Sequence, residues 1–144
     1  MQRMLKGILD DKGSNVWSVR PDDTVLNALE TMAEHNIGAL LVFEGDDLVG
    51  ILSERDYARK VKLLDRGSKE TRVSEIMTTE IRTVGSASTV AECMELMTEY
   101  RIRHLPVLDE DGQVAGVISI GDVVKAMIAQ QRDMIDQLER YITS

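Results

Sequence analysis

The sequence predicts a mixed α/β protein made of two pseudo-symmetric β-α-β-β-α repeats and an extended C-terminal helix. The first observation is a duplication: nine residues between Val19 and Val42 recur 65 positions later, between Val84 and Val107. The second is that helical spacing and short apolar runs follow in the same order in both copies. Because a unit of about 50 residues is marginal alone, we expect the two repeats to pack sheet to sheet.

The repeat and the local composition divide the chain into five segments. We expect an N-terminal lead-in over residues 1–15, a first repeat over 16–64, a polar linker over 65–72, a second repeat over 73–129 and a helical extension over 130–144. The lead-in also has a weak counterpart, because residues 7–10 (Gly-Ile-Leu-Asp) resemble residues 75–78 (Glu-Ile-Met-Thr).

The long helix of each repeat is predicted from apolar residues spaced three and four apart. These residues are Val25, Ala28, Leu29, Met32 and Ile37 in the first repeat and Val90, Cys93, Met94, Met97 and Ile102 in the second. Thr89 and Glu92 have the spacing of a capping box, which marks the start of the second helix. Since Cys93 shares the buried face, we expect a packed small side chain rather than a reactive thiol.

A hairpin is predicted after each of these helices. Residues 38–44 and 48–53 are short apolar runs on either side of an acidic turn that contains glycine, and residues 103–109 and 114–119 repeat them. One additional residue in the second turn changes the offset between the copies from 65 to 66. A further helix begins near the end of each hairpin.

The final helix carries an apolar stripe that runs past the end of the second repeat. Its members are Val124, Met127, Ile128, Met134, Ile135, Leu138, Tyr141 and Ile142. Such a stripe needs a covering surface. A dimer contact or a cover over the core is the simplest interpretation, and docking of a different protein is the other.

The composition limits the classes of function. The 144 residues carry 17 Lys and Arg against 25 Asp and Glu, a formal charge of −8, which argues against binding to nucleic acid. One cysteine and two histidines exclude an internal disulfide and leave too few ligands for a structural zinc site. The longest apolar run is too short for a membrane span, and residues 1–16 lack the features of a secretory or transit peptide. We therefore expect a cytoplasmic protein with no membrane segment.

One motif, Gly-x-x-Ser-x-x-Asp, occurs at the same place in both copies. It contains Gly50, Ser53 and Asp56 in the first copy and Gly116, Ser119 and Asp122 in the second. For a single copy, a helix-capping box is the simpler explanation. A helix N-terminus with a nearby carboxylate also suits a nucleotide, because the backbone N–H groups attract phosphate and the carboxylate accepts hydrogen bonds from a ribose diol.

With this motif in both copies, the chain resembles a tandem pair of CBS domains, the Bateman module, of the stand-alone bacterial type. The resemblance implies a non-catalytic regulatory module that senses energy or redox state and binds adenine nucleotides in clefts between the repeats. It implies that Asp56 and Asp122 hold the ribose and that Ser53 and Ser119 lie near the phosphate. It also implies a homodimer that acts on a regulated protein, which the sequence does not identify.

The second copy is expected to form the tighter site, centred on Asp122, because its flanking residues differ from those of the first. Arg101, Arg103 and His104 are its phosphate candidates, with a solvated strand edge as the alternative. Arg55 and Arg59 offer a second pair of cations on one helix face of the first copy, with a solvated helix surface as the alternative. Candidate adenine contacts and flanking positions are Ile120, Gly121, Thr83, Val84 and Met77 for the second cleft and Ser18 for the first.

The adenosine-containing ligand is expected to be AMP, because few cations lie near Asp122. ADP, ATP, NAD(H) and S-adenosylmethionine share the same adenosine group and stay open. A second hypothesis is a protein-interaction scaffold with vestigial ligand clefts, in which the terminal helix is the working surface. An enzyme is disfavoured, since the sequence has no P-loop, no nucleophile flanked by a base and no cluster of metal ligands.

Overall fold

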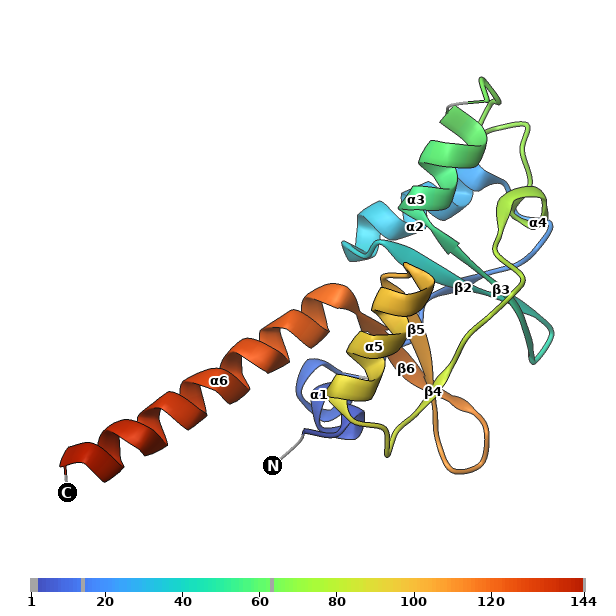
Figure 1. Cartoon of the computed structure of the whole chain (residues 1–144). Helices are drawn as coiled ribbons and strands as arrows, with labels where there is room; N and C mark the ends of the chain where they lie inside the picture. The colour runs from blue at the N-terminus through green and yellow to red at the C-terminus, as the bar shows by residue number, and fades with distance from the viewer. Residues whose placement is uncertain (1–2, 14, 63, 144) are drawn as a thin grey trace. The chain divides into compact units, whose positions relative to one another are not determined.

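The computed structural model describes residues 3–13, 15–62 and 64–143, and its contacts divide the chain into two compact units. The central unit is Val16–Ile81, and the terminal unit combines residues 1–15 with residues 82–144. Each unit has its own three-stranded mixed sheet and its own core (Figure 1). The predicted α/β fold with a duplicated unit is confirmed.

The central unit follows the predicted order of elements. Its elements are β1 (Ser18–Val19), α2 (Val25–His35), β2 (Ala39–Glu44), β3 (Asp47–Ser53), α3 (Glu54–Tyr57), a π-helical turn (Ala58–Lys62) and α4 (Val73–Ile76). Strand β1 pairs in parallel with β2, and β2 pairs antiparallel with β3.

The terminal unit repeats this topology. Its elements are α1 (Leu5–Lys12), β4 (Val84–Gly85), α5 (Val90–Tyr100), β5 (His104–Leu108), β6 (Val114–Ser119) and α6 (Ile120–Thr143). Strand β4 pairs in parallel with β5, and β5 pairs antiparallel with β6. Even the shift in strand register is duplicated, since it falls after Val42 in one hairpin and after Val107 in the other.

The helices α2 and α5 start at equivalent threonine caps. The Thr24 hydroxyl accepts a hydrogen bond from the Asn27 N–H, and the Thr89 hydroxyl accepts one from the Glu92 N–H, each at 3.1 Å. Both helices therefore begin where a side chain satisfies a free N–H group of the first turn. The predicted buried face is present, and Cys93 is inaccessible within it. Burial, aided by the charge of Asp122, raises the pKa of the Cys93 thiol to about 11, so the thiol stays protonated at neutral pH.

The boundaries of the two units differ from those of the sequence repeats at the segments that precede each repeat. Residues 73–81 pack in the central unit, where Met77 lies against Gly50 of β3. Helix α1 packs in the terminal unit, where Leu9 lies against Gly116 of β6. A Cβ atom at either glycine would stand 2.6 Å from the covering side chain, so glycine lets each segment approach its strand. The weak similarity of residues 7–10 and 75–78 thus corresponds to equivalent packing.

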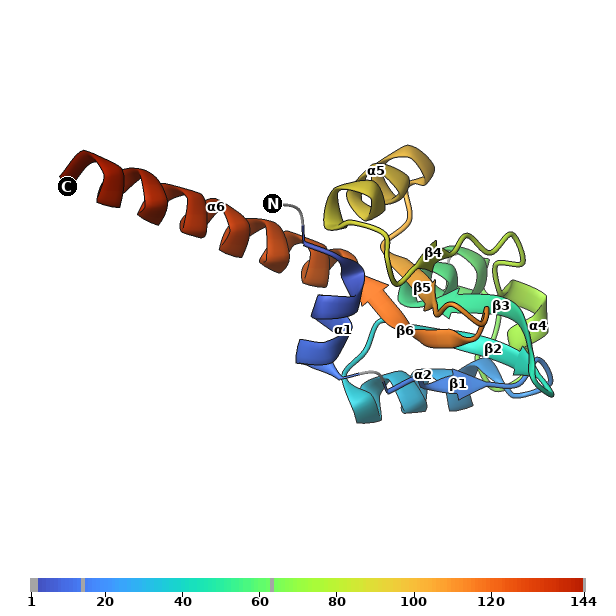
Figure 2. The same ribbon diagram turned by 90° about the horizontal axis from the view of Figure 1, so that it is seen from below.

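Helix α6 is anchored only at its start. Val123 and Ala126 are buried in the core of the terminal unit, whereas every residue from 131 to 143 is exposed. In Figure 2 the red end of the helix runs away from the other elements of its unit. Among the described helices, none is both long and apolar enough to cross a membrane.

Candidate functional site

The second motif joins the end of β6 to the first turn of α6. The Ser119 N–H donates a hydrogen bond to Asp122 Oδ2 at 2.9 Å, and the Asp122 N–H donates one to Ser119 Oγ at 3.2 Å. These reciprocal bonds are the predicted capping arrangement. They hold the carboxylate of Asp122 at a helix N-terminus, where the backbone dipoles favour negative charge.

The first motif has the same local geometry at the start of α3. The Ser53 N–H donates to Asp56 Oδ2 at 2.9 Å, and the Asp56 N–H donates to Ser53 Oγ at 3.1 Å. Both aspartates are therefore helix caps. Each carboxylate also accepts bonds from outside its motif, and these additional partners distinguish the two copies.

In the terminal unit the additional partner of Asp122 is Lys12, the last residue of α1. The Lys12 ammonium donates to Asp122 Oδ2 at 2.7 Å and to the Val117 carbonyl at 3.1 Å. Partial burial of Asp122 opposes ionisation, but the bonds from Lys12 and from Ser119 outweigh it, so the pKa of Asp122 lies below its usual value. The motif therefore presents an ionised carboxylate with an ammonium group beside it.

In the central unit the partners of Asp56 are Thr78 and Lys60. The Thr78 hydroxyl donates to Asp56 Oδ1 at 3.2 Å, and Lys60 Nζ lies 3.2 Å from the same oxygen. Thr78 is held in place by its backbone, since its N–H donates to the Ile51 carbonyl at 2.9 Å. Both oxygens of Asp56 thus have protein partners.

Two equivalent backbone carbonyls have different hydrogen-bond donors in the two copies. Val117 is the counterpart of Ile51, because the motifs are offset by 66 residues. In the central unit the Ile51 carbonyl accepts a hydrogen bond from the Thr78 backbone N–H. In the terminal unit the Val117 carbonyl accepts one from the Lys12 ammonium. A flexible charged side chain at the second motif therefore replaces a backbone contact at the first.

His104 and Arg103 lie across from the second motif. His104 is paired with Ser119 in the sheet, and the Ile120 N–H donates to the Arg103 carbonyl at 2.8 Å. Burial lowers the pKa of His104, and the positive charges of Lys12 and Arg103 add to this effect against the opposing charge of Asp122. His104 is therefore a neutral imidazole at neutral pH, next to the motif.

The remaining predicted residues fall in different places. Ile120 and Gly121 form the start of α6, beside Asp122. Arg101 is the exposed left-handed residue that ends α5, and Thr83 is exposed just before β4. The Val84 side chain is part of the core and is only 6% exposed.

The central unit holds the other candidates. Arg55 is exposed in the first turn of α3, and Ser18 is exposed in β1. Met77, which was expected beside the second motif, packs against Gly50 in the unit of the first motif because its backbone runs along β3.

Three functional contacts were not predicted from the sequence. Lys12 lies 110 residues from its partner, so no local pattern relates the two. Thr78 is the counterpart of Asp10 in the weak similarity of the lead-in segments, and that similarity was the only signal for it. Lys60 follows Asp56 by four residues on a helical segment, a spacing that indicates an ion pair and could have been recognised.

The family follows from the match of the whole repeated unit. A family model of the CBS domain matches residues 8–63 and again residues 73–129, which together are more than half of the chain. The chain belongs to the CBS-domain family. Across the described residues, no group of three or more His, Cys, Asp or Glu side chains is arranged to hold a metal ion.

CBS-domain proteins from bacteria and plants are similar to this chain over most of its length. A mitochondrial CBS domain-containing protein of Arabidopsis thaliana, CBSX3, is 44% identical over 135 residues, which are 90% of this chain. The match spans 65% of that relative's length. The structure of a CBS-domain protein from Burkholderia ambifaria is 53% identical, covers 89% of this chain and 96% of its own, and superposes with a TM-score of 0.84.

Two other solved structures carry information on ligands and assembly. A CBS domain pair in complex with 5′-methylthioadenosine and S-adenosyl-L-methionine is 25% identical, covers 90% of this chain and 99% of its own, and has a TM-score of 0.77. A hexameric CBS-CP12 protein from bloom-forming cyanobacteria is 30% identical, covers 86% of this chain and 67% of its own, and has a TM-score of 0.76. CBS relatives of this chain therefore bind adenosine compounds and form oligomers.

Proposed function

We propose that this CBS-domain protein is a non-catalytic regulatory module that binds an adenine nucleotide, AMP, with its tighter site at Asp122. The observation that carries the proposal is the ionised Asp122 carboxylate at a helix N-terminus, with Lys12 at 2.7 Å and neutral His104 on the paired strand. A ribose diol needs an ionised acceptor, and a phosphate needs a nearby cation. The second motif offers these together.

The ribose hydroxyls would donate to the Asp122 carboxylate, and Ser119 would lie toward the phosphate. The adenosine compounds bound by one CBS relative support this class of ligand. Ile120, Gly121, Thr83 and Val84 remain the candidates for contacts around the base, through backbone groups where the side chain is buried. Met77 was also expected to contact the base, but it packs against Gly50 in the central unit.

Lys12 would supply the principal cation for the phosphate, with His104, Arg103 and Arg101 as additional donors. When the ribose hydroxyls donate to the Asp122 carboxylate, the Lys12 ammonium loses this carboxylate as its acceptor. The phosphate then accepts the hydrogen bond from Lys12 instead. A single phosphate matches this small set of cations better than a triphosphate does, because each additional phosphate adds negative charge to a chain of net charge −8. AMP is therefore preferred to ATP.

The first motif would be the weaker site. Beyond the capping bonds that both motifs share, Asp56 accepts a hydrogen bond from Thr78 and pairs with Lys60, so a ribose must displace two protein partners there, against the single Lys12 ammonium at Asp122. Ser53, Arg55 and Ser18 would contribute to this site.

The biological output would be a change in conformation or assembly that reports the energy or redox state of the cell to a partner. We propose a homodimer in the cytoplasm that acts on a separate regulated protein. The size of any response is limited by the difference in ligand affinity between the two states.

Thermal unfolding with AMP, ADP, ATP, NAD, NADH and S-adenosylmethionine tests the proposal. A ligand at about 100 times its Kd adds about 2.7 kcal/mol to the free energy of unfolding, so we expect a clear rise of Tm with AMP. Asp122→Asn should abolish the rise, Asp56→Asn should reduce it slightly, and Asp133→Asn on an exposed turn of α6 is the matched control. Absence of a shift with any ligand, in protein free of bound nucleotide, would refute the proposal, as would sustained turnover of a nucleotide.

The exposed stripe on α6 favours a second candidate function, a scaffold that binds proteins through this helix. This function predicts no stabilisation by nucleotides and an assembly that depends on Leu138 and Ile142. Truncation before Gln130 should abolish the scaffold's assembly. The nucleotide-induced shift of Tm, which only the sensor predicts, distinguishes the two functions.

A further inference from the structure

Helix α6 presents a row of exposed apolar side chains along most of its length. Seven large apolar residues of the helix are exposed, and exposure rises along the helix to 82% at Tyr141 and 80% at Ile142. The other members are Val124, Ile128, Met134, Ile135 and Leu138. Because contiguous exposed apolar surface of this kind indicates an interaction site, the face needs an occupant.

The spacing of these residues is that of a helix that pairs with another helix. Ile128, Ile135 and Ile142 are seven residues apart, and Val124, Gln131 and Leu138 form a second series with the same period. The two series alternate in steps of three and four, as the a and d positions of a coiled coil do. A third series, Met127, Met134 and Tyr141, lies along one side of them, and Lys125, Arg132 and Glu139 lie along the other.

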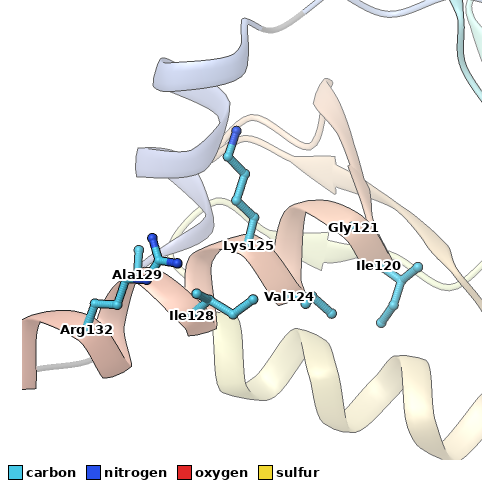
Figure 3. Close-up of a pocket in the computed structure, with 7 residues that line it drawn as sticks. All are labelled: Ile120, Gly121, Val124, Lys125, Ile128, Ala129 and Arg132. Atoms are coloured by element: carbon cyan, nitrogen blue, oxygen red, sulfur yellow. The ribbon is translucent and has the colours of Figure 1, made fainter. Parts of the chain in front are cut away.

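The surface along the first half of the same helix has a depression. A surface depression of about 520 Å³ is lined by Ile120, Gly121, Val124, Lys125, Ile128, Ala129 and Arg132. In Figure 3 the side chains of Ile120, Val124 and Ile128 follow one another along α6, and Lys125 extends away from them. The helix therefore offers an apolar depression at one end and a projecting apolar ridge at the other.

We propose that the occupant is a second copy of this chain, and that the two α6 helices pair antiparallel about a two-fold axis near residue 133. A two-fold axis makes each contact occur twice, so each ridge fills the partner's depression. In this alignment Ile128 meets the partner's Leu138, Val124 meets the partner's Ile142, and Met134 meets the partner's Met134. All seven exposed apolar residues then lie in or beside the contact.

The charges favour this direction over a parallel pair. The antiparallel alignment places Lys125 beside the partner's Glu139, and the two-fold axis repeats this pair. It also brings the two Arg132 side chains near each other, at an exposed edge where solvent screens the repulsion. A parallel, in-register pair would instead place Met134 beside the partner's Glu139 and leave Lys125 without an acidic neighbour.

The contact would lie next to the candidate nucleotide site. Ile120 and Gly121 line the depression, and they directly precede Asp122 in the first turn of α6. The inference rests on the proposed function only for this link, in which a nucleotide at Asp122 changes the affinity of the two copies for each other.

Single cysteine variants of the full-length protein test the pairing directly. Met134→Cys should form a disulfide-linked dimer under mild oxidation, because the residue faces its own copy near the axis. Leu138→Cys should not, since Leu138 faces the partner's Ile128, and Gln137→Cys on the opposite side of the helix should not either. The buried native Cys93 should leave the wild-type protein uncrosslinked.

Sedimentation equilibrium supplies the energetic test. Leu138→Asp should weaken dimerisation by about 100-fold or more, because it places an unpaired charge in the contact, and the matched Gln137→Asp should change it by less than about threefold. Leu138 is 57% exposed in the single chain, so the variant should keep its fold. A monomeric wild-type protein, crosslinking by Leu138→Cys instead of Met134→Cys, or equal effects of the two Asp variants would overturn the inference. A nucleotide-induced rise of Tm that persists in those cases would leave the proposed nucleotide binding standing.

Discussion

Lys12→Met is the substitution that tests the candidate site most sharply. Methionine has a similar length and apolar stem but no ammonium group, so the packing of α1 on β6 is retained. The substitution removes the 2.7 Å bond to Asp122 and the 3.1 Å bond to the Val117 carbonyl. The carboxylate then keeps its bond from the Ser119 N–H.

The effect on stability should be small, and the effect on ligand choice should be large. The Lys12 side chain is 38% exposed and that of Asp122 is 21% exposed, so solvent screens the pair and its loss should cost no more than about 1 kcal/mol. A bond between the ammonium and a phosphate is worth about 1.5–3 kcal/mol, which corresponds to AMP binding roughly 10- to 100-fold more weakly. Adenosine has no phosphate, so it should bind equally well or up to about fivefold more tightly once the ammonium no longer competes for Asp122.

Isothermal titration calorimetry with AMP and with adenosine measures both affinities. The matched control is Lys6→Met, which removes an exposed lysine from the same helix and should change neither. A ratio of AMP to adenosine affinity that is the same in Lys12→Met and in the wild-type protein would refute the role of Lys12 at the phosphate. Equal weakening of both ligands would show that Lys12 only positions Asp122.

Three further predictions concern stability. Gly116→Ala should lower the free energy of unfolding by about 1–3 kcal/mol in urea titrations, because its Cβ would stand 2.6 Å from Leu9 Cδ2; an unchanged midpoint would show that α1 yields easily. The lowered pKa of Asp122 means that its ionised form stabilises the fold fully above the unfolded value of about 4, so the difference in stability between the wild-type protein and Lys12→Met should decrease as pH falls below about 4 and vanish below the lowered pKa of the folded state. The lowered pKa of His104 has the opposite origin, since the fold disfavours its charged form. Stability should therefore fall as pH drops below about 6.5, and His104→Gln should flatten this slope in thermal unfolding.

The elements of each unit could be predicted because every local signal occurs twice. The threonine caps at Thr24 and Thr89 and the paired positions Leu40 and Leu105 have the same role in both copies. A pattern that could be accidental in one copy is therefore supported by its counterpart. The motif could be located for the same reason, since its serine and aspartate form the same reciprocal bonds at both sites.

Lys12 and Thr78 could not be predicted as partners of the motif, because they lie in segments that pack on the other repeat. Local periodicity relates residues within a helix or hairpin, whereas Lys12 reaches Asp122 across 110 residues. Met77 shows the same limit. Its position before β4 suggests the second copy, yet the backbone pairing of residue 78 with Ile51 holds it in the first.

These lead-in segments explain why the two copies of one motif should differ in function. At the first copy, the backbone of Thr78 is held by its pairing with Ile51, and the Thr78 hydroxyl and the Lys60 ammonium both lie at Asp56 Oδ1. At the second copy, the equivalent positions are occupied by one flexible side chain, which can move to a new acceptor while Leu9 and the rest of α1 stay buried. Apart from the capping bond within the motif, a ligand at Asp122 therefore has to displace only the Lys12 ammonium group. If that ligand carries a phosphate, it supplies the acceptor that the ammonium needs. The selectivity of the second copy for phosphorylated nucleosides then follows from the same contact that occupies its carboxylate in the absence of ligand.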